Sequence, residues 1–410
     1  MVKAKKAAFI WNMLGSGMNA AMTMLLTVAT AQIVDVDASG LLSLAFGFAF
    51  IFGCVATFEV RVYQSTDIEG RFTFGDYLSV RCMSCLVSIA ACFAMLMLMG
   101  YNGQKAQIIF FVCLFKVCEA MSDVCQGLCH ARGHLEYAGQ SLFMRTLSAS
   151  VIYILVLWLT KSPVYAALSM PLTSMLYFIF LDRKYVHMLN EKLTINVSLK
   201  ATKGIVRECW PLAVSSVMTM YILNVEKVQI DRYAAQFQGT WTALFMPAAV
   251  INLFSLFVFR PLLTSLTETW NEGRKGDFSR ECLKIVACIS FVSFGVILAG
   301  NYIGIPVLEK LYHVFLQGYS TQFALILLGG GLNAVATFMW HMLILMRQQQ
   351  QIIAGDAIAF LFALFMVPLM VKQYSLGGAT AGYLLNMLIR AAIFTFFVFW
   401  SARDIRAKRH

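Results

Sequence analysis

The sequence is dominated by apolar runs that are long enough to cross a membrane. A transmembrane helix needs about 20 apolar residues to span the hydrocarbon core. Twelve such runs occur, at about 7–33, 38–58, 78–100, 106–128, 140–160, 164–181, 209–230, 240–263, 282–300, 321–346, 352–371 and 379–401. Hydrocarbon cannot satisfy backbone hydrogen bonds, so each spanning run must be helical. The sequence therefore predicts an all-α integral membrane protein with twelve transmembrane helices.

The composition agrees with a membrane protein and argues against nucleic-acid binding. Hydrophobic residues make up 60% of the 410 residues and charged residues only 13%, whereas soluble domains are about 45–50% apolar and 25% charged. The net charge of +11 comes largely from basic residues in short segments between apolar runs. Basic residues in such loops are typical of membrane proteins, whereas a nucleic-acid-binding protein would gather them on one binding surface.

The basic residues predict the orientation of the chain. With the N-terminus inside, twenty basic residues lie on the inner side, and six lie outside: Lys105, Lys161, Lys227, Arg232, Lys310 and Lys372. Positive charge is enriched on the cytoplasmic side of membrane proteins, so both termini are predicted to be cytoplasmic. The first apolar run is too long for a signal peptide, and we interpret it as a retained helix.

The chain divides into two halves that repeat. Residues 1–183 and 209–410 each hold six apolar runs, and 184–208 form a basic cytoplasmic linker. The connections after the second and eighth runs share Glu-Gly-Arg (69–71 and 272–274) and Gly-Asp-aromatic (75–77 and 276–278). We predict two parallel-repeat six-helix bundles around a central cavity, related by an axis along the membrane normal.

Three charges in the run 106–128 need a special environment. Lys116, Glu119 and Asp123 fall on one helical face, together with Gln126 and His130. Each charge costs about 2.5–3.5 kcal/mol at bilayer depth, which makes contact with lipid unfavourable. This polar stripe must therefore face a protein interior or a watery cavity.

Basic residues in the other runs suggest an anion-binding site. Arginine can bind phosphate oxygens with two parallel hydrogen bonds, and clustered cations lower the cost of removing a phosphate from water. We predict a cationic substrate-binding cavity that contains Lys116, Arg145, Arg260 and Arg390. Arg61, Arg81 and Lys284 are predicted to lie at its cytoplasmic mouth, with interfacial anchoring as the alternative. Internal ion pairs, such as Lys116 with Glu119 or Asp123, are the alternative to an open cavity.

Acidic residues within the runs are candidates for ion coupling. Glu119, Asp123 and Asp356 could bind a proton or Na⁺, as intramembrane carboxylates often do. The alternative is that Lys116 simply neutralises one of them. Near the outer end of the seventh run, the segment 224–232 is either an outer gate or a solvated helix end.

The sequence lacks the signatures of enzymes and of ATP-driven pumps. It contains no G-x-S-x-G, no P-loop and no H-E-x-x-H motif. Cys82 and Cys85 form a C-x-x-C inside an apolar run, where we interpret them as buried hydrophobic residues rather than a redox or metal site. We expect no catalytic residue, no metal and no cofactor, and any pumping must use Na⁺ or H⁺ gradients, the membrane potential or a downhill cargo.

Three local patterns resemble one transporter superfamily. They are E-x-x-x-D-x-x-x-G (Glu119, Asp123, Gly127) followed by Arg132–Ser141 and Arg145, the segment 259–266, and the segment 304–312. With the 6+6 repeat, they resemble the multidrug/oligosaccharidyl-lipid/polysaccharide exporter superfamily. Within it, they are most similar to the Wzx-type polysaccharide flippases, including the teichoic-acid flippases.

The resemblance implies a flippase of the bacterial inner membrane. Such proteins move undecaprenyl-(pyro)phosphate-linked oligosaccharide to the outer leaflet for surface polysaccharides, such as the O-antigen of lipopolysaccharide. The expected partners are that substrate, membrane lipid, and glycosyltransferases or a polymerase of the same pathway. The alternatives are a multidrug/cation antiporter of the same fold and, from another class, a membrane glycan polymerase or ligase.

Overall fold

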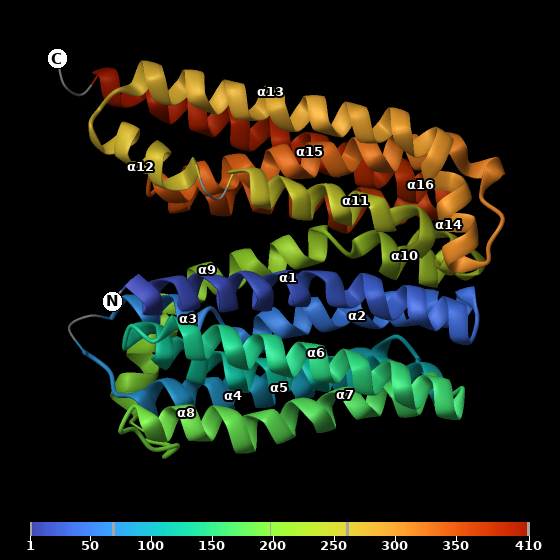
Figure 1. The fold of residues 1–410 in the computed structure, drawn as a ribbon. Helices are drawn as coiled ribbons and strands as arrows, with labels where there is room; N and C mark the ends of the chain where they lie inside the picture. Colours follow the sequence, from blue (N-terminus) through green and yellow to red (C-terminus); the bar gives the residue numbers. More distant parts are fainter. Residues whose placement is uncertain (1, 68–69, 197, 260–261, 408–410) are drawn as a thin grey trace. The chain divides into compact units, whose positions relative to one another are not determined.

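A computed structural model describes residues 2–67, 70–196, 198–259 and 262–407 (Figure 1). Helices account for nearly all of these residues, and the described ranges contain no β-strand. This confirms the predicted all-α class. The predicted site residue Arg260 lies outside the described residues.

The first half of the chain supplies six long helical segments. They are α1 (Val2–Ile33), α2 (Val36–Thr57), α4 (Phe74–Leu98), α5 (Gly103–Ala131), α6 (Leu135–Thr160) and α7 (Pro163–Tyr177), which continues through a π-helical segment (Phe178–Asp182) into α8 (Arg183–Met188). The short α3 (Val60–Thr66) lies between the second and third long helices.

The second half supplies six more crossings. They come from α9 (Leu199–Ile222) with α10 (Val225–Tyr233), α11 (Gln238–Phe259), α13 (Lys275–Ala299), α15 (Ser320–Leu345) and α16 (Gln349–Ala407). Two short helices, α12 (Leu263–Asn271) and α14 (Ile305–Tyr312), join them, with 3-10 turns at 235–237 and 317–319 and a π-helical turn at 300–304.

The long α16 is a hairpin of two antiparallel helices. Ser375 has a non-helical backbone (φ 49°, ψ −124°) that reverses the chain. Across the hairpin, the Ser401 hydroxyl donates to Gln351 Oε1 at 2.9 Å, and Arg390 pairs with Asp356 at 3.1 Å. Hence α16 supplies the eleventh and twelfth crossings.

The hydropathy of the helices agrees with twelve crossings. Seven described segments combine spanning length with high mean hydropathy, and α16 is counted once among them although it crosses twice. The remaining long helices, α1, α5, α9 and α11, each have at least 22 residues, which is enough to span. The protein is therefore a multi-pass membrane protein.

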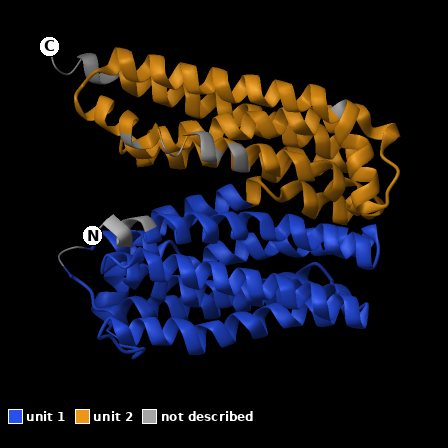
Figure 2. Cartoon of the chain, in the orientation of Figure 1, with its two compact units in different colours: residues 1–220 blue, residues 221–410 orange. Residues whose placement is uncertain are grey.

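The chain forms two compact units, Met1–Met220 and Tyr221–His410 (Figure 2). The helices on either side of the predicted linker extend into it, so the connection lies only between Met188 and Leu199. These helix ends are polar and continue past the apolar runs from which the linker was predicted. The boundaries 1–183, 184–208 and 209–410, which were derived from the sequence repeat, stay a prediction.

Each half of the chain is built around its fourth long helix. In the first half, α5 packs against α2, α4, α6 and α7, and in the second half, α15 packs against α11, α13 and α16. A short helix, α3 or α12, follows the second long helix of each half. This common order of elements is the one that a parallel repeat predicts.

Small residues allow the central helix of the second unit to approach three neighbours. A Cβ on Gly329 would meet the Tyr383 ring of α16, one on Gly330 would lie 3.0 Å from Ala248 Cβ of α11, and one on Gly331 would meet Ser293 of α13. Helices in lipid associate through this kind of close packing, since hydrocarbon provides no hydrophobic force between them.

A matched pair of glycines in α1 and α6 tests this packing. A Cβ on Gly139 of α6 would lie 2.6 Å from the Asn12 backbone nitrogen of α1, whereas one on Gly17 would have no neighbour within 4 Å. We expect Gly139→Val to destabilise the protein by about 2 kcal/mol through overpacking. Gly17→Val should leave the midpoint of thermal unfolding in detergent almost unchanged. Equal midpoints for the two variants would contradict this account of the α1–α6 contact.

Candidate functional site

The polar stripe of α5 is the centre of a buried charge network in the first unit. Asp123 sits between two arginines, with Arg61 Nη1 2.9 Å from Oδ1 and Arg81 Nη2 2.9 Å from Oδ2. Arg61 Nη1 also donates to Gln126 Oε1 at 3.1 Å, one turn further along α5. The predicted mouth residues Arg61 and Arg81 are therefore held together by one carboxylate.

The end of α2 explains how Arg81 is tolerated in the interior. Phe58 and Glu59 adopt left-handed backbone conformations (φ 44° and 52°), which end α2 and start α3. The Ala56 carbonyl, near this helix end, accepts from Arg81 Nη1 at 3.1 Å and from Ser84 Oγ at 2.6 Å. Basic side chains commonly satisfy such carbonyls. Arg81 is 0% exposed, so these partners replace its hydration.

A second carboxylate, Glu119, is shared by two predicted substrate-binding residues. Lys116 Nζ forms an ion pair with Oε2, and Arg145 Nη2 of α6 lies 3.3 Å from Oε1. The Lys116 stem packs beside Gly53 of α2, and its ammonium lies 5.0 Å from the centre of the Phe50 ring. The internal ion pair that the sequence left as an alternative is therefore present. Whether Lys116 and Arg145 also bind a substrate stays a prediction.

Two further acids border the network and are held by hydroxyls. Asp182 Oδ1 accepts from Ser141 Oγ at 2.5 Å, and Arg145 attracts its carboxylate. Glu59 Oε1 accepts from Ser216 Oγ of α9 at 2.6 Å. The four bases (Arg61, Arg81, Lys116, Arg145) thus face four acids (Glu59, Glu119, Asp123, Asp182). The net charge of the network is zero when all eight groups are ionised and rises by one for each proton that it takes up.

Arg145 keeps unused hydrogen-bonding capacity inside this network. Its side chain is 2% exposed, and its Nε and Nη1 are buried without a hydrogen-bond partner among the described residues. Asp182 Oδ2 is likewise buried without a hydrogen-bond partner among the described residues. Buried polar atoms are usually satisfied, so unsatisfied donors at one guanidinium mark a place where an anion or water would be stabilised.

The second unit contains the remaining predicted charges. Arg390 pairs with Asp356 through Nε at 3.1 Å, and both side chains are buried within the α16 hairpin. Lys284 lies exposed on α13. The structure therefore brings together two predicted site residues. Arg390 was predicted to bind the substrate and Asp356 to couple an ion.

Glu226 is a buried carboxylate that lies where the sequence allowed a solvated helix end. Asn224 interrupts the helix (φ −130°, ψ 0°), and the following α10 buries Glu226 to 1% exposure. Neither carboxylate oxygen accepts a hydrogen bond from another described residue. The neighbouring Lys227 is buried as well and donates to Asn224 Oδ1 at 3.1 Å. The solvated-end interpretation is therefore wrong for Glu226 and Lys227, which follow the break at Asn224, whereas Arg232 at the end of α10 is exposed.

The sequence predicted the charged face of α5. It did not indicate that Asp182 is buried, and it left Glu226 as a residue of a gate or of a solvated helix end. Asp182 stands at the end of an apolar run beside Arg183 and Lys184, which resembles an ordinary helix terminus. Its inward direction depends on the π-helical segment Phe178–Asp182, which periodicity does not reveal. Among the described residues, no group of three His, Cys, Asp or Glu side chains could hold a metal ion, and the eleven cysteines are free thiols.

No protein-family model matches the chain, and no curated protein matches it in sequence. Solved structures do match. An inward-facing multidrug resistance MATE family transporter of the MOP superfamily has a TM-score of 0.69 and 13% identity, with 95% of each chain covered. An outward-facing MATE structure has a TM-score of 0.63 and 13% identity, with 98% of this chain and 96% of that chain covered.

A third match is a MOP superfamily transporter from Pyrococcus furiosus. Its TM-score is 0.61 at 14% identity, with 99% of this chain and 97% of that chain covered. All three are described as transporters and span essentially the whole chain. The protein is therefore a polytopic helical membrane protein, and more particularly one with the fold of the MATE transporters of the MOP superfamily.

The shared carboxylate Asp123 should be essential for stability. Asp123→Asn leaves the buried Arg81 without a counter-charge, which should cost about 3 kcal/mol. Glu191→Gln is the control, because Glu191 pairs at 2.6 Å with the exposed Arg132, and such surface pairs contribute about 1 kcal/mol or less. The measurement is the midpoint of thermal unfolding in detergent. Similar midpoints for both variants would show that the charge network does not hold the first unit together.

Proposed function

We propose that this protein is an alternating-access flippase for lipid-linked oligosaccharide that carries a phosphate or pyrophosphate. In this proposal, the polar head crosses through the protein while the polyprenyl tail remains in the bilayer. The protein would act in the bacterial inner membrane with both termini cytoplasmic, beside glycosyltransferases or a polymerase of the same pathway. The resemblance of the α5 motif and the segment after it to Wzx-type flippases motivates this substrate class.

The unsatisfied guanidinium of Arg145 carries the proposal. An anion that reached this network would find Nε and Nη1 of Arg145 without a described partner and a second cation, Lys116, on the same carboxylate. The four bases of the network are balanced by four acids, so its net charge does not select the cargo. The unused donors of Arg145 fit a phosphate-bearing cargo better than a cation, because a guanidinium donates hydrogen bonds and accepts none.

The fold supports a transport cycle and tolerates different pocket polarities. MATE transporters of this fold have been solved facing inward and outward. The Pyrococcus furiosus protein is described as having a binding pocket of reverse polarity that suggests a different function. A change of pocket charge within this fold therefore has a precedent. The substrate-binding roles of Arg260 and Arg390 remain part of the proposal.

Arg145→Lys is the sharpest test, because it keeps the positive charge beside Glu119 and removes the guanidinium fork. We expect flipping of a fluorescent polyprenyl-pyrophosphate oligosaccharide in proteoliposomes to fall at least about tenfold, since the unused Nε and Nη1 donors of Arg145 are lost. Thermal unfolding should change little. Lys105→Gln, near the start of α5 and away from the network, is the control. Normal flipping by Arg145→Lys would refute the anion site.

A multidrug/cation antiporter is the second candidate, and Glu226 is the observation that favours it. Its two carboxylate oxygens are buried without a hydrogen bond from any other residue that the structure describes, and a proton or Na⁺ would satisfy them. By contrast, Glu119, Asp123 and Asp356, the acids first predicted to couple ions, already hold basic partners. Ion coupling in either type of transporter would therefore use Glu226 more readily than these three.

Dye efflux by the unmodified protein separates the two candidates, and Glu226→Gln tests the coupling residue of the antiporter. In an antiporter, the variant should abolish efflux of a cationic dye driven by a proton or Na⁺ gradient, because the exchangeable carboxylate is gone. Asp231→Asn, on the same helix but only partly buried, should retain efflux. The measurement is dye fluorescence in proteoliposomes with an imposed gradient. The absence of dye transport by the unmodified protein would reject the antiporter, whatever the variants do.

A further inference from the structure

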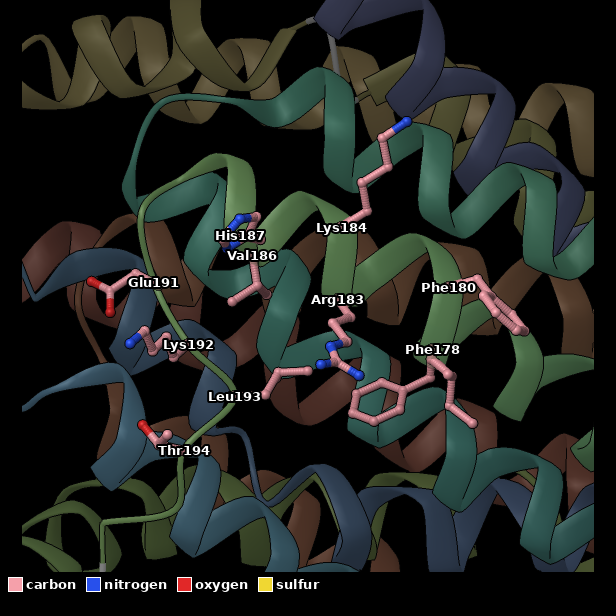
Figure 3. A pocket seen from close by; sticks show the side chains of 11 residues that line it. Phe178, Phe180, Arg183, Lys184, Val186, His187, Glu191, Lys192, Leu193 and Thr194 are labelled. Atoms are coloured by element: carbon pink, nitrogen blue, oxygen red, sulfur yellow. The ribbon is translucent and has the colours of Figure 1, made fainter.

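The end of the first unit carries a groove that the transport proposal does not use (Figure 3). Its volume is about 930 Å³, within the usual range for ligand sites. One wall is the π-helical segment with α8, and the other is the connecting segment 191–194. Figure 3 shows the guanidinium of Arg183 directed toward Leu193, which belongs to that connecting segment.

The groove has an excess of positive charge. Arg183, Lys184 and Lys192 line it, and none of them forms an ion pair with another described residue. The one acid of the lining, Glu191, is already bound to Arg132 at 2.6 Å. His187 adds a further nitrogen-bearing side chain to the lining. The complementary ligand is therefore an anion.

The apolar part of the groove continues along the exposed face of α7. Phe178, Ile179 and Phe180 line the groove, and Phe180 is 72% exposed. Leu176 and Leu172 lie four and eight residues before Phe180 and are also exposed. Side chains at this spacing share one face of a helix, so they form an apolar strip about 12 Å long that leads away from the basic residues.

We propose that this groove binds an anionic glycerophospholipid of the membrane leaflet on its own side. The basic residues would hold the phosphate, and an acyl chain would lie along Phe180, Leu176 and Leu172. The charge distribution predicts this end of the protein to be cytoplasmic, where anionic lipids attract basic segments at the membrane surface. A soluble phosphate compound would leave the apolar strip unused, which is why we assign the site to a lipid.

The test uses the purified full-length chain and photo-crosslinkable phosphatidylglycerol. We expect crosslinks in residues 172–194, and weaker labelling with the same probe built on phosphatidylcholine. The double variant Arg183→Gln/Lys192→Gln should weaken phosphatidylglycerol binding by at least about tenfold, since each basic residue near an anionic surface contributes to affinity. Lys200→Gln/Lys203→Gln, at the start of α9 and outside the groove, removes the same charge and should bind normally.

Several outcomes would overturn the proposal. Equal labelling by the two lipids, crosslinks elsewhere, or equal losses in both double variants would show that the groove does not recognise an anionic lipid. Displacement of the probe by millimolar inorganic phosphate would identify a soluble-anion site. Displacement by polyprenyl phosphate, but not by unlabelled phosphatidylglycerol, would make the groove a site for the transported lipid. The unmodified chain provides the crosslink map even if a variant fails to fold.

Discussion

The first unit depends on the requirement that each charge within the membrane finds a counter-charge in its own bundle. Insertion of a lone arginine is costly, and breaking a buried pair is costlier than never having formed it. Asp123 and Glu119 meet this requirement with only two acids, because each carboxylate binds two basic residues from different helices. The α5 stripe thereby joins α3, α4 and α6 to the central helix, so that the same residues organise the bundle and supply its polar site.

The central helix contacts its neighbours through different side chains in the two units. In the first, α5 approaches its neighbours through ion pairs, helped by Gly53 and Gly127, whose missing side chains leave room for Lys116 and Gln64. In the second, three consecutive glycines of α15 give close contact with three helices. A bundle held by backbone proximity needs no internal charge. Among the described residues of the second unit, buried charge is accordingly found at separate sites, the Asp356–Arg390 pair and the neighbours Glu226 and Lys227.

Apolar run length was sufficient to predict twelve helices, since the physics of the bilayer leaves few alternatives. Helical periodicity also placed Lys116, Glu119 and Asp123 on one face. The sequence could not decide how these charges pair, because Arg61 and Arg81 reach Asp123 from other helices through tertiary packing. It could not place Asp182 or Glu226 either. Their inward direction depends on a π-helical turn and on a break at Asn224, which are local departures from the helical period.

The π-helical segment at 178–182 determines which residues face inward at the end of the sixth crossing. Such a turn holds one residue more than an α-helical turn, and each α-helical residue rotates the next side chain by about 100°. The insertion therefore divides neighbouring polar residues between two environments, with Asp182 toward Ser141 and Arg183 toward the groove. A single-residue deletion before Asp182 in this turn would give Arg183 the direction that Asp182 now has and rotate Asp182 by about 100° away from Ser141, without changing either side chain. Relatives that differ in length at this position should consequently differ in both the charge network and the surface groove.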